Sequence, residues 1–496
     1  MRSDERTIEN SSRSSKSSPV RFRTIGATAN LKRRHTVLPS IRAGQAMSSL
    51  LQTTVGSLTA GLNRERLRFW GIQSGVSILD QGLTSGASFV LNLFLARWLT
   101  AEGYGAFAVA FATLLFISGF HNVLLLEPMS VFGPASHALS TVSYFRAQLR
   151  VHFLLTASLS TLLLLMAAAI ATLGIHRELA LATVASAVAF PLVLFLWLVR
   201  RMCYVVHRPT IAVWASAGYL ALLLVSLFLM HRLGRMNPAA AIIVMALASV
   251  AAVLAPLCKL QILSPPRGTL CSWKEVLREN WSYGRWLVVS TMLYSVASQT
   301  QLYLAAALLG LGAAGVLRAM QMPSLIMTQV VSAIGLLLLP TMAREYGRGH
   351  LHRLRRKAVY ASVVLAATAS AYAAALGIFA RPIERLMYSG KFSSSAWLIS
   401  VLGLVPVCTG IAAGFSMALR ACQKPHFDLL ANAISAPVGL VTAVFFTKLW
   451  GLGGASISMV AGFATYAAVF FWSFRRWSTS RELGGFGGLQ RGPCTR

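Results

Sequence analysis

Long apolar runs alternate with short polar segments along most of this chain. Twelve runs between residues 75 and 474 each come close to the roughly 20 apolar residues that a helix needs to cross a bilayer. The pattern therefore predicts an all-α polytopic membrane protein with about twelve transmembrane helices. The predicted spans are 75–99, 104–126, 153–175, 179–199, 211–230, 238–258, 284–309, 317–340, 358–380, 396–419, 429–450 and 454–474.

The polar segments divide the chain into five parts. Residues 1–68 are rich in Ser, Arg and Thr and contain no long apolar run, so they are expected to form a disordered, basic cytoplasmic tail, and Met47 is an alternative start to Met1. A polar linker separates two groups of six spans. The predicted parts are the tail 1–68, an N-terminal lobe 69–258, a cytoplasmic linker 259–283, a C-terminal lobe 284–474 and a cytoplasmic tail 475–496.

The two groups of spans resemble each other. "RERLRFWG" (64–71) resembles "RENWSYG" (278–284), and "LLLEPMSVFG" (124–133) resembles "LLLLPTMAREYG" (336–347). Six spans in each half give both halves the same orientation, so the repeats are parallel, related by an axis along the membrane normal. The sequence predicts two six-helix lobes.

Composition and charge agree with a membrane protein and assign its orientation. The chain is 56% hydrophobic and 12% charged, with a mean hydropathy of +0.63, whereas a soluble protein carries about 25% charged residues. The net charge is +31; with the N-terminus inside, the inner segments carry +26 and the outer ones +6. The positive-inside rule then places both termini in the cytoplasm of an inner-membrane protein, and the basic charge needs no nucleic acid to explain it.

The sequence offers no sign of catalysis, so the protein is not expected to be an enzyme. It has no GxxxxGK[ST] nucleotide-binding loop, and its cysteines form neither a CxxC pair nor a zinc-ligand spacing. No cofactor or metal is expected, apart from a coupling ion, proton or sodium.

The first span has a polar face centred on an acidic residue. At 100° per residue, its polar side chains fall within an arc of about 140°. A charged carboxylate inside a membrane is costly and indicates function. This face either lines a water-filled cavity or packs against other helices, and its acid could equally pair with a buried arginine. The cavity candidates from this span are Asp80, Gln81, Thr84, Ser88 and Asn92.

The seventh span repeats this pattern, which predicts a central cavity between the two lobes. Arg97 lies off the polar face of the first span, and we expect it to reach the outer headgroups. The candidates from the seventh span are Thr291, Tyr294, Ser295, Ser298 and Gln301.

Residues 79–112, "LDQGLTSGASFVLNLFLARWLTAEGYGAFAVAFA", resemble the polysaccharide-export and O-antigen flippase branch of the multidrug/oligosaccharidyl-lipid/polysaccharide exporter superfamily. The matching pattern is a polar-faced helix and then R-x-L-x-x-x-x-Y-G, here Arg97, Leu99, Tyr104 and Gly105. After the second span, "HNVLLLEPMSVFGP" departs from the Gly-rich turn of many members. The resemblance implies a V-shaped transporter that moves a polyprenyl-pyrophosphate-linked glycan between leaflets by alternating access.

The residues suit such a substrate, because a charged, sugar-bearing headgroup cannot cross hydrocarbon unaided. Arg285 and Arg318 are candidate phosphate contacts, or they anchor their helices at the interface. The expected partners are the lipid-linked glycan, the bilayer and an assembly protein such as a polysaccharide polymerase. The alternatives are a cation-coupled multidrug exporter of the same superfamily and a non-transporting scaffold of an envelope-polymer complex.

Overall fold

The computed structural model describes residues 75–174, 176–262, 271–422, 424 and 426–483. The regular elements in these ranges are all helices. The predicted tail 1–68 and residues 484–496 of the predicted C-terminal tail lie outside the described residues.

The first described helix covers residues 75–98. The remaining elements are α2 (Ala101–His121), η1 (Asn122–Leu126), α3 (Glu127–Ser136), η2 (Ala138–Ser140), α4 (Thr141–Thr172), α5 (Arg177–Val205), α6 (Pro209–Arg232), α7 (Pro238–Lys259), α8 (Trp273–Leu309), α9 (Leu311–Gly347), α10 (Leu351–Ile378), α11 (Ala380–Tyr388), η3 (Ser393–Ser395), α12 (Trp397–Leu402), α13 (Leu404–Ala421) and α14 (His426–Leu483).

The prediction of about twelve membrane helices is confirmed. Nine helical segments among the described residues are long and apolar enough to span a bilayer. The helix over 75–98 and the more polar α8 correspond to the predicted first and seventh spans. The long α14 holds the last two, since its backbone leaves helical geometry at Trp450 and Gly451. Gly451 has a φ of +56°, a conformation that glycine adopts at little cost.

Polar residues lengthen several helices beyond the predicted spans. Helix α8 begins at Trp273, within the predicted linker 259–283, because hydropathy detects only the part of a helix that lies in hydrocarbon. The second predicted span continues from α2 through η1, a π-helical segment, into α3. A π-helical turn often marks a functional position in a helix.

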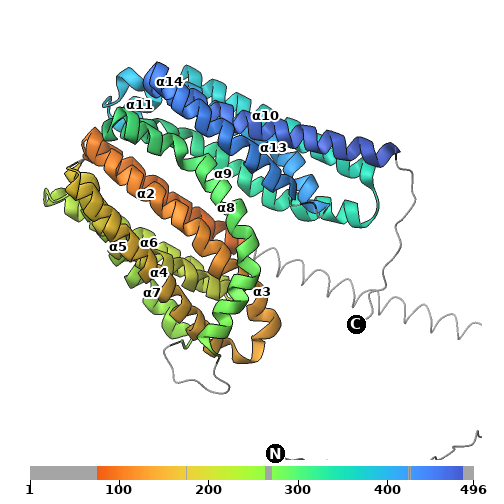
Figure 1. The fold of residues 1–496 in the computed structure, drawn as a ribbon, viewed down its shortest axis with the longest axis horizontal. Helices are drawn as coiled ribbons and strands as arrows, with labels where there is room; N and C mark the ends of the chain where they lie inside the picture. The colour runs from red at the N-terminus through yellow and green to blue at the C-terminus, as the bar shows by residue number, and fades with distance from the viewer. Residues whose placement is uncertain (1–74, 175, 263–270, 423, 425, 484–496) are drawn as a thin grey trace, which may run out of the picture. The chain divides into compact units, whose positions relative to one another are not determined.

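The helices form two bundles that correspond to the predicted lobes (Figure 1). In the N-terminal lobe, α5 packs against α2, α4 and α7, and α6 packs against α7. In the C-terminal lobe, α13 packs against α9, α10 and α14. The lobes meet where α2 packs against α9 and where α8 reaches across to η1 and α4.

Helix α8 contacts both lobes. Near its start, Asn280 and Gln148 of α4 exchange two side-chain hydrogen bonds of 3.0 and 3.2 Å, and both residues are buried. Its later turns pack against α14 and α9. The helix that begins the second half of the repeat therefore joins the halves as well as contributing to its own lobe.

Candidate functional site

Asp80 lies in a buried polar cluster within the N-terminal lobe. Its carboxylate oxygen Oδ2 accepts hydrogen bonds from Arg200 Nη2 and from the Tyr204 hydroxyl, both at 2.6 Å. Oδ1 accepts a hydrogen bond of 2.5 Å from the Ser216 hydroxyl. The Asp80 side chain is 2% exposed and that of Arg200 is 12% exposed. Of the alternatives that the sequence left open, the structure shows the buried pair with an arginine.

Three helices supply this cluster. Asp80 is less than two turns into the described part of the first helix, Arg200 and Tyr204 occupy one face of the last turns of α5, and Ser216 lies two turns into α6. The carboxylate accepts three hydrogen bonds, one of them from the cationic Arg200, and these lower the cost of burying its negative charge. Arg200 Nε has no hydrogen-bond partner among the described residues, so Arg200 binds Asp80 through Nη2 and its buried Nε–H is left without an acceptor there.

The remaining predicted residues of the first helix divide into two groups. Thr84 donates to the Asp80 carbonyl at 2.9 Å and lies 3.5 Å from the Ser216 hydroxyl, which places it in the Asp80 cluster. Asn92 is buried; it donates to the Ser88 carbonyl at 2.8 Å and accepts from the Tyr104 hydroxyl at 3.2 Å. Gln81 is exposed. Much of the predicted polar face is therefore occupied by contacts within the N-terminal lobe.

The polar residues of α8 also face different neighbours. Thr291 and Ser295 approach Gly119 of α2, whereas Gln301 lies against Gly439 and Gly462 of α14. Tyr294 is 55% exposed, and Ser298 donates to the Ser295 carbonyl at 3.2 Å. Among the described residues, no hydrogen bond joins the two predicted polar faces.

The candidate phosphate contacts have contrasting surroundings. Arg285 is exposed on α8. Arg318 is buried where α9 meets α2, with its guanidinium 5.8 Å from the centre of the Phe111 ring and Nη1 donating to Gln321 at 3.2 Å. Arg318 Nε has no hydrogen-bond partner among the described residues. Arg318 is thus a buried cation for which those residues form no ion pair.

The starts of α2 and α9 cross in very close contact. A β-carbon on Gly105 would lie 1.8 Å from the Leu311 carbonyl oxygen, and one on Gly315 would lie 2.4 Å from that of Ala101. Only glycine allows backbones to approach this closely. The two lobes are joined at this end of the molecule, which we call the outer end because the charge count predicts that it faces outward.

Two cations strengthen this outer junction by binding carbonyl groups at helix ends. Lys391 Nζ donates to the carbonyl oxygens of Ala96, at 2.9 Å, and Leu99, at the end of the first helix. Arg97 Nη2 donates to the Leu386 carbonyl at 3.0 Å and to the Ser389 hydroxyl at 3.1 Å, at the end of α11. Each lobe thus supplies a cation to a helix C-terminus of the other, where the helix dipole favours positive charge.

These contacts revise the expectation for Arg97, which was placed at the outer headgroups. Arg97 is exposed, but it also holds the C-terminal lobe. Burial lowers the pKa of Lys391, because its ammonium has given up part of its hydration for carbonyl oxygens. We call the four contacts of Arg97 and Lys391 the outer clasp.

Comparison with known proteins agrees with this architecture. The model of the family described as "Polysaccharide biosynthesis protein" matches residues 73–345, more than half of the chain. The chain belongs to this family. The match includes the Asp80 cluster, the crossing of α2 with α9 and most of α9 itself. A comparison with curated proteins finds no matching relative.

Solved structures similar to this family member share its fold. An inward-facing multidrug resistance MATE family transporter of the MOP superfamily is 15% identical, with a TM-score of 0.69, covering 82% of this chain and 96% of that one. The lipid II flippase MurJ in an inward closed conformation is 12% identical, with a TM-score of 0.63, covering 82% and 87%. An outward-facing MATE transporter of the MOP superfamily is 17% identical, with a TM-score of 0.58, covering 83% and 97%.

Sequence reasoning missed three residues that surround Asp80 in this family member: Arg200, Tyr204 and Ser216. Arg200 begins an Arg-Arg pair at the end of the fourth predicted span, where the positive-inside rule alone explains basic residues. A helical projection cannot show which neighbouring helix a polar face meets. The one available signal was that a buried acid requires a cation, and many arginines lie next to predicted spans, so the signal could not single out Arg200.

A second buried polar chain in the N-terminal lobe contacts the backbone of α5 around a proline. Pro191 within α5 has no N–H, so the Ala187 carbonyl one turn earlier accepts from the Ser160 hydroxyl at 2.6 Å instead. The Pro191 carbonyl lies 3.2 Å from His152 Nε2, and His152 Nδ1 lies 3.0 Å from His121 Nε2. One arrangement satisfies both contacts: His121 donates to His152, which donates to the Pro191 carbonyl.

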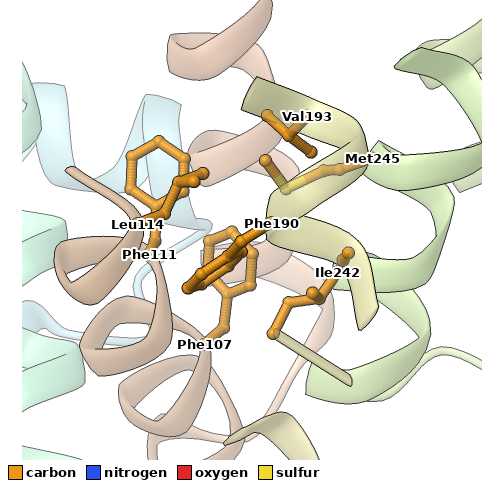
Figure 2. Close-up of a pocket in the computed structure, with 8 residues that line it drawn as sticks. Phe107, Phe111, Leu114, Phe190, Val193, Ile242 and Met245 are labelled. Atoms are coloured by element: carbon orange, nitrogen blue, oxygen red, sulfur yellow. The ribbon is translucent and has the colours of Figure 1, made fainter. Parts of the chain in front are cut away.

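The interior of the N-terminal lobe is closely packed between α2, α5 and α7. Figure 2 shows Phe107, Phe111 and Leu114 of α2 meeting Phe190 and Val193 of α5 and two side chains of α7. The space among these side chains cannot hold a water molecule. The lobe is therefore solidly packed at this position.

Proposed function

We propose that this protein moves a lipid-linked oligosaccharide or polysaccharide precursor across the cytoplasmic membrane by alternating access. The observation that carries the proposal is the match to the polysaccharide biosynthesis family over residues 73–345, on a chain that has the fold of membrane transporters. One structural neighbour is the lipid II flippase MurJ, whose name gives it a lipid as substrate.

The outer junction supports an inward-facing state of such a transporter. The lobes are held at their outer ends by the glycine crossing and the outer clasp. The TM-score is also higher for the inward-facing MATE transporter, 0.69, than for the outward-facing one, 0.58. Transport would require these outer contacts to open while the packed lobes move as bodies.

Arg318 is the better of the two phosphate candidates in this scheme. It is buried between the lobes without a paired carboxylate, so an anionic group could replace hydration that the guanidinium has lost. Arg285, exposed on α8, fits a first contact or an anchor at the membrane surface. Thr291, Tyr294 and Ser298 are the α8 residues that we assign to the sugar.

Energy coupling is also part of the proposal. A proton or sodium ion bound at Asp80 would have to compete with Arg200, which already neutralises the carboxylate at 2.6 Å. Coupling at this position would therefore work by releasing Arg200 from Asp80. We infer that the ion and the arginine occupy the carboxylate in different states.

The alternative of a cation-coupled multidrug exporter rests on the MATE-like fold. It is less favoured because the acid of the first helix is already paired, whereas a cationic drug needs a carboxylate of its own. A scaffold that transports nothing is the other alternative.

Reconstitution into liposomes separates these functions. The expected result is that the protein moves a polyprenyl-pyrophosphate-linked glycan from one leaflet to the other, measured by protection from an external glycan-modifying enzyme. Uptake or efflux of a cationic dye without glycan movement would favour the drug exporter, and no movement of either would favour the scaffold. Arg318→Gln should lower glycan movement, while Arg381→Gln, an exposed change on α11, should leave it unchanged.

The orientation is tested independently. With both termini in the cytoplasm, reporter fusions after residues 235 and 390 should report from outside, and fusions after 270 and 350 from inside. The reverse pattern would move the outer clasp to the cytoplasmic face and reverse the assigned direction of opening.

A further inference from the structure

A groove on the outside of the N-terminal lobe lies between α4 and the first residue of α8. It has a volume of about 530 Å³ and is lined by Leu149, Arg150, Phe153, Leu154 and Trp273. Phe153 is 45% exposed and Leu154 is 52% exposed, so the groove presents apolar side chains at the molecular surface. An exposed apolar surface on a membrane helix ordinarily faces lipid.

The groove lies where α4 changes from a polar to an apolar sequence. Arg146, Gln148, Arg150 and His152 precede a run that is almost entirely apolar as far as residue 171. Phe153 and Leu154 are about one helical turn deeper than Arg150, roughly 5 Å along the axis. The groove therefore combines a charged end at headgroup level with an apolar end at the start of the hydrocarbon.

The end of the groove at headgroup level is positively charged. Arg150 is exposed and forms no hydrogen bond or ion pair with the described residues, whereas Arg146 donates to the Ile262 carbonyl at 2.8 Å. On the other wall, Lys274 Nζ lies 5.7 Å from the centre of the Trp273 ring. No carboxylate lines the groove. The nearest carboxylates along α8 are Glu275, which is exposed and follows Lys274, and Glu279, which is bonded to His137 at 3.0 Å.

We propose that this groove binds an anionic phospholipid of the inner leaflet, with its phosphate at Arg150 and an acyl chain along Phe153 and Leu154. The occupant follows from charge and depth: a cation at the headgroup level attracts an anionic lipid, and a tryptophan is favoured at the same level. The inner leaflet follows from the charge count, which places this end of α4 in the cytoplasm. The site is separate from the transport pathway proposed above and does not depend on it.

Native mass spectrometry of the purified full-length protein tests this site. The protein is mixed in detergent with phosphatidylglycerol or phosphatidylcholine of the same chain length, and retained lipids are counted. We expect at least one phosphatidylglycerol to be retained more strongly than phosphatidylcholine. Arg150→Gln should weaken that retention about fivefold, which corresponds to about 1 kcal/mol for one cation near an anionic headgroup. Arg150→Lys should retain most of it.

A second variant tests the apolar end without changing charge. Leu154→Trp fills the groove from a half-exposed position and should also reduce phosphatidylglycerol retention. Arg177→Gln is the matched control, since it removes an exposed arginine at the far end of α5 and should change nothing. Variants are compared only if they elute as the wild type does in size-exclusion chromatography; should Arg150→Gln fail this check, Leu154→Trp and Arg150→Lys decide.

Three outcomes would overturn the proposal. Equal retention of both lipids by the wild type would remove the charge argument. Unchanged phosphatidylglycerol retention in Arg150→Gln and Leu154→Trp would place the lipid elsewhere. Displacement of the bound lipid by a polyprenyl phosphate at equal concentration, but not by phosphatidylglycerol, would assign the groove to the transported substrate instead.

Discussion

Each lobe contains one aspartate–arginine pair at the end assigned to the cytoplasm, and the two pairs differ in burial. In the N-terminal lobe, Asp80 and Arg200 are 2.6 Å apart, with side chains 2% and 12% exposed. In the C-terminal lobe, Asp428 and Arg420 are 2.5 Å apart, but their side chains are 17% and 43% exposed. The arginines end the fourth and tenth predicted spans, which are equivalent positions in the internal repeat.

The difference shows how one repeated position has acquired two physical roles. Asp80 and Arg200 come from helices far apart in sequence, so their pair holds the first helix against α5. Asp428 and Arg420 are eight residues apart, at the start of α14 and the end of α13, so their pair closes a local turn. A buried pair is strongly destabilised when one partner is lost, whereas an exposed pair contributes little.

The largest expected effect is that of Asp80→Asn. The amide keeps the shape but leaves Arg200 buried without its counter-charge, at a cost of about 3–5 kcal/mol. The purified variant should show a much lower thermal midpoint in detergent and should not move glycan. Removing both charges, in Asp80→Asn with Arg200→Gln, should recover part of the stability.

The double variant also tests the coupling proposal. If it is stable and still inactive, Asp80 has a transport role beyond holding the lobe together. If Asp80→Asn melts at the wild-type temperature, the pair is not the stabilising contact that the geometry indicates, and the comparison between lobes fails.

Asp80 and Arg200 show most clearly what the sequence could predict and what it could not. The number of membrane helices and the existence of two lobes followed from the sequence because hydrophobic length and repeat order are properties of one chain segment at a time. The unusual position of Asp80 was also detectable, since an acid within an apolar run is costly. Its partner Arg200 was not, because it lies 120 residues away beside an ordinary basic helix end.

The same reasoning explains the outer clasp. Arg97 and Lys391 bind backbone carbonyls, which every residue has, so nothing in the sequence marks their partners. The glycine crossing of α2 and α9 has two glycines as its only sequence trace, and glycines are frequent in membrane helices. Contacts between lobes were therefore the least predictable part of the candidate site.

An intermediate effect is expected for Lys391→Ala, which removes a cation satisfied by carbonyls rather than by a carboxylate. Hydrogen bonds from a charged donor contribute about 1.5–3 kcal/mol, so the outer junction should open more often. A cysteine placed at Ala101, in a background without the native cysteines, should then be labelled from outside more than about tenfold faster. Arg97→Ala should act in the same direction, and more weakly, because Arg97 donates to only one carbonyl group and one hydroxyl, whereas Lys391 donates to two carbonyl groups.

The control for this experiment is Arg381→Ala, which removes an exposed cation from α11, the short helix that ends just before Lys391. It should leave labelling unchanged. Equal labelling in Lys391→Ala and the wild type would show that the glycine crossing alone closes the outer end.

The smallest effect is expected for Asp428→Asn, and its salt dependence should distinguish it from Asp80→Asn. With 43% of the Arg420 side chain exposed, water can solvate the guanidinium once the carboxylate is lost, so the cost should be below about 1 kcal/mol. Salt screens exposed charges over about 3 Å at 1 M, but it cannot enter a dry cluster. Thermal midpoints in 0.1 M and 1 M salt should therefore converge between wild type and Asp428→Asn, while Asp80→Asn stays well below both. A large, salt-independent loss of thermal stability in Asp428→Asn would mean that the C-terminal pair stabilises its lobe as strongly as the buried N-terminal pair does. The repeated position would then have the same role in both lobes.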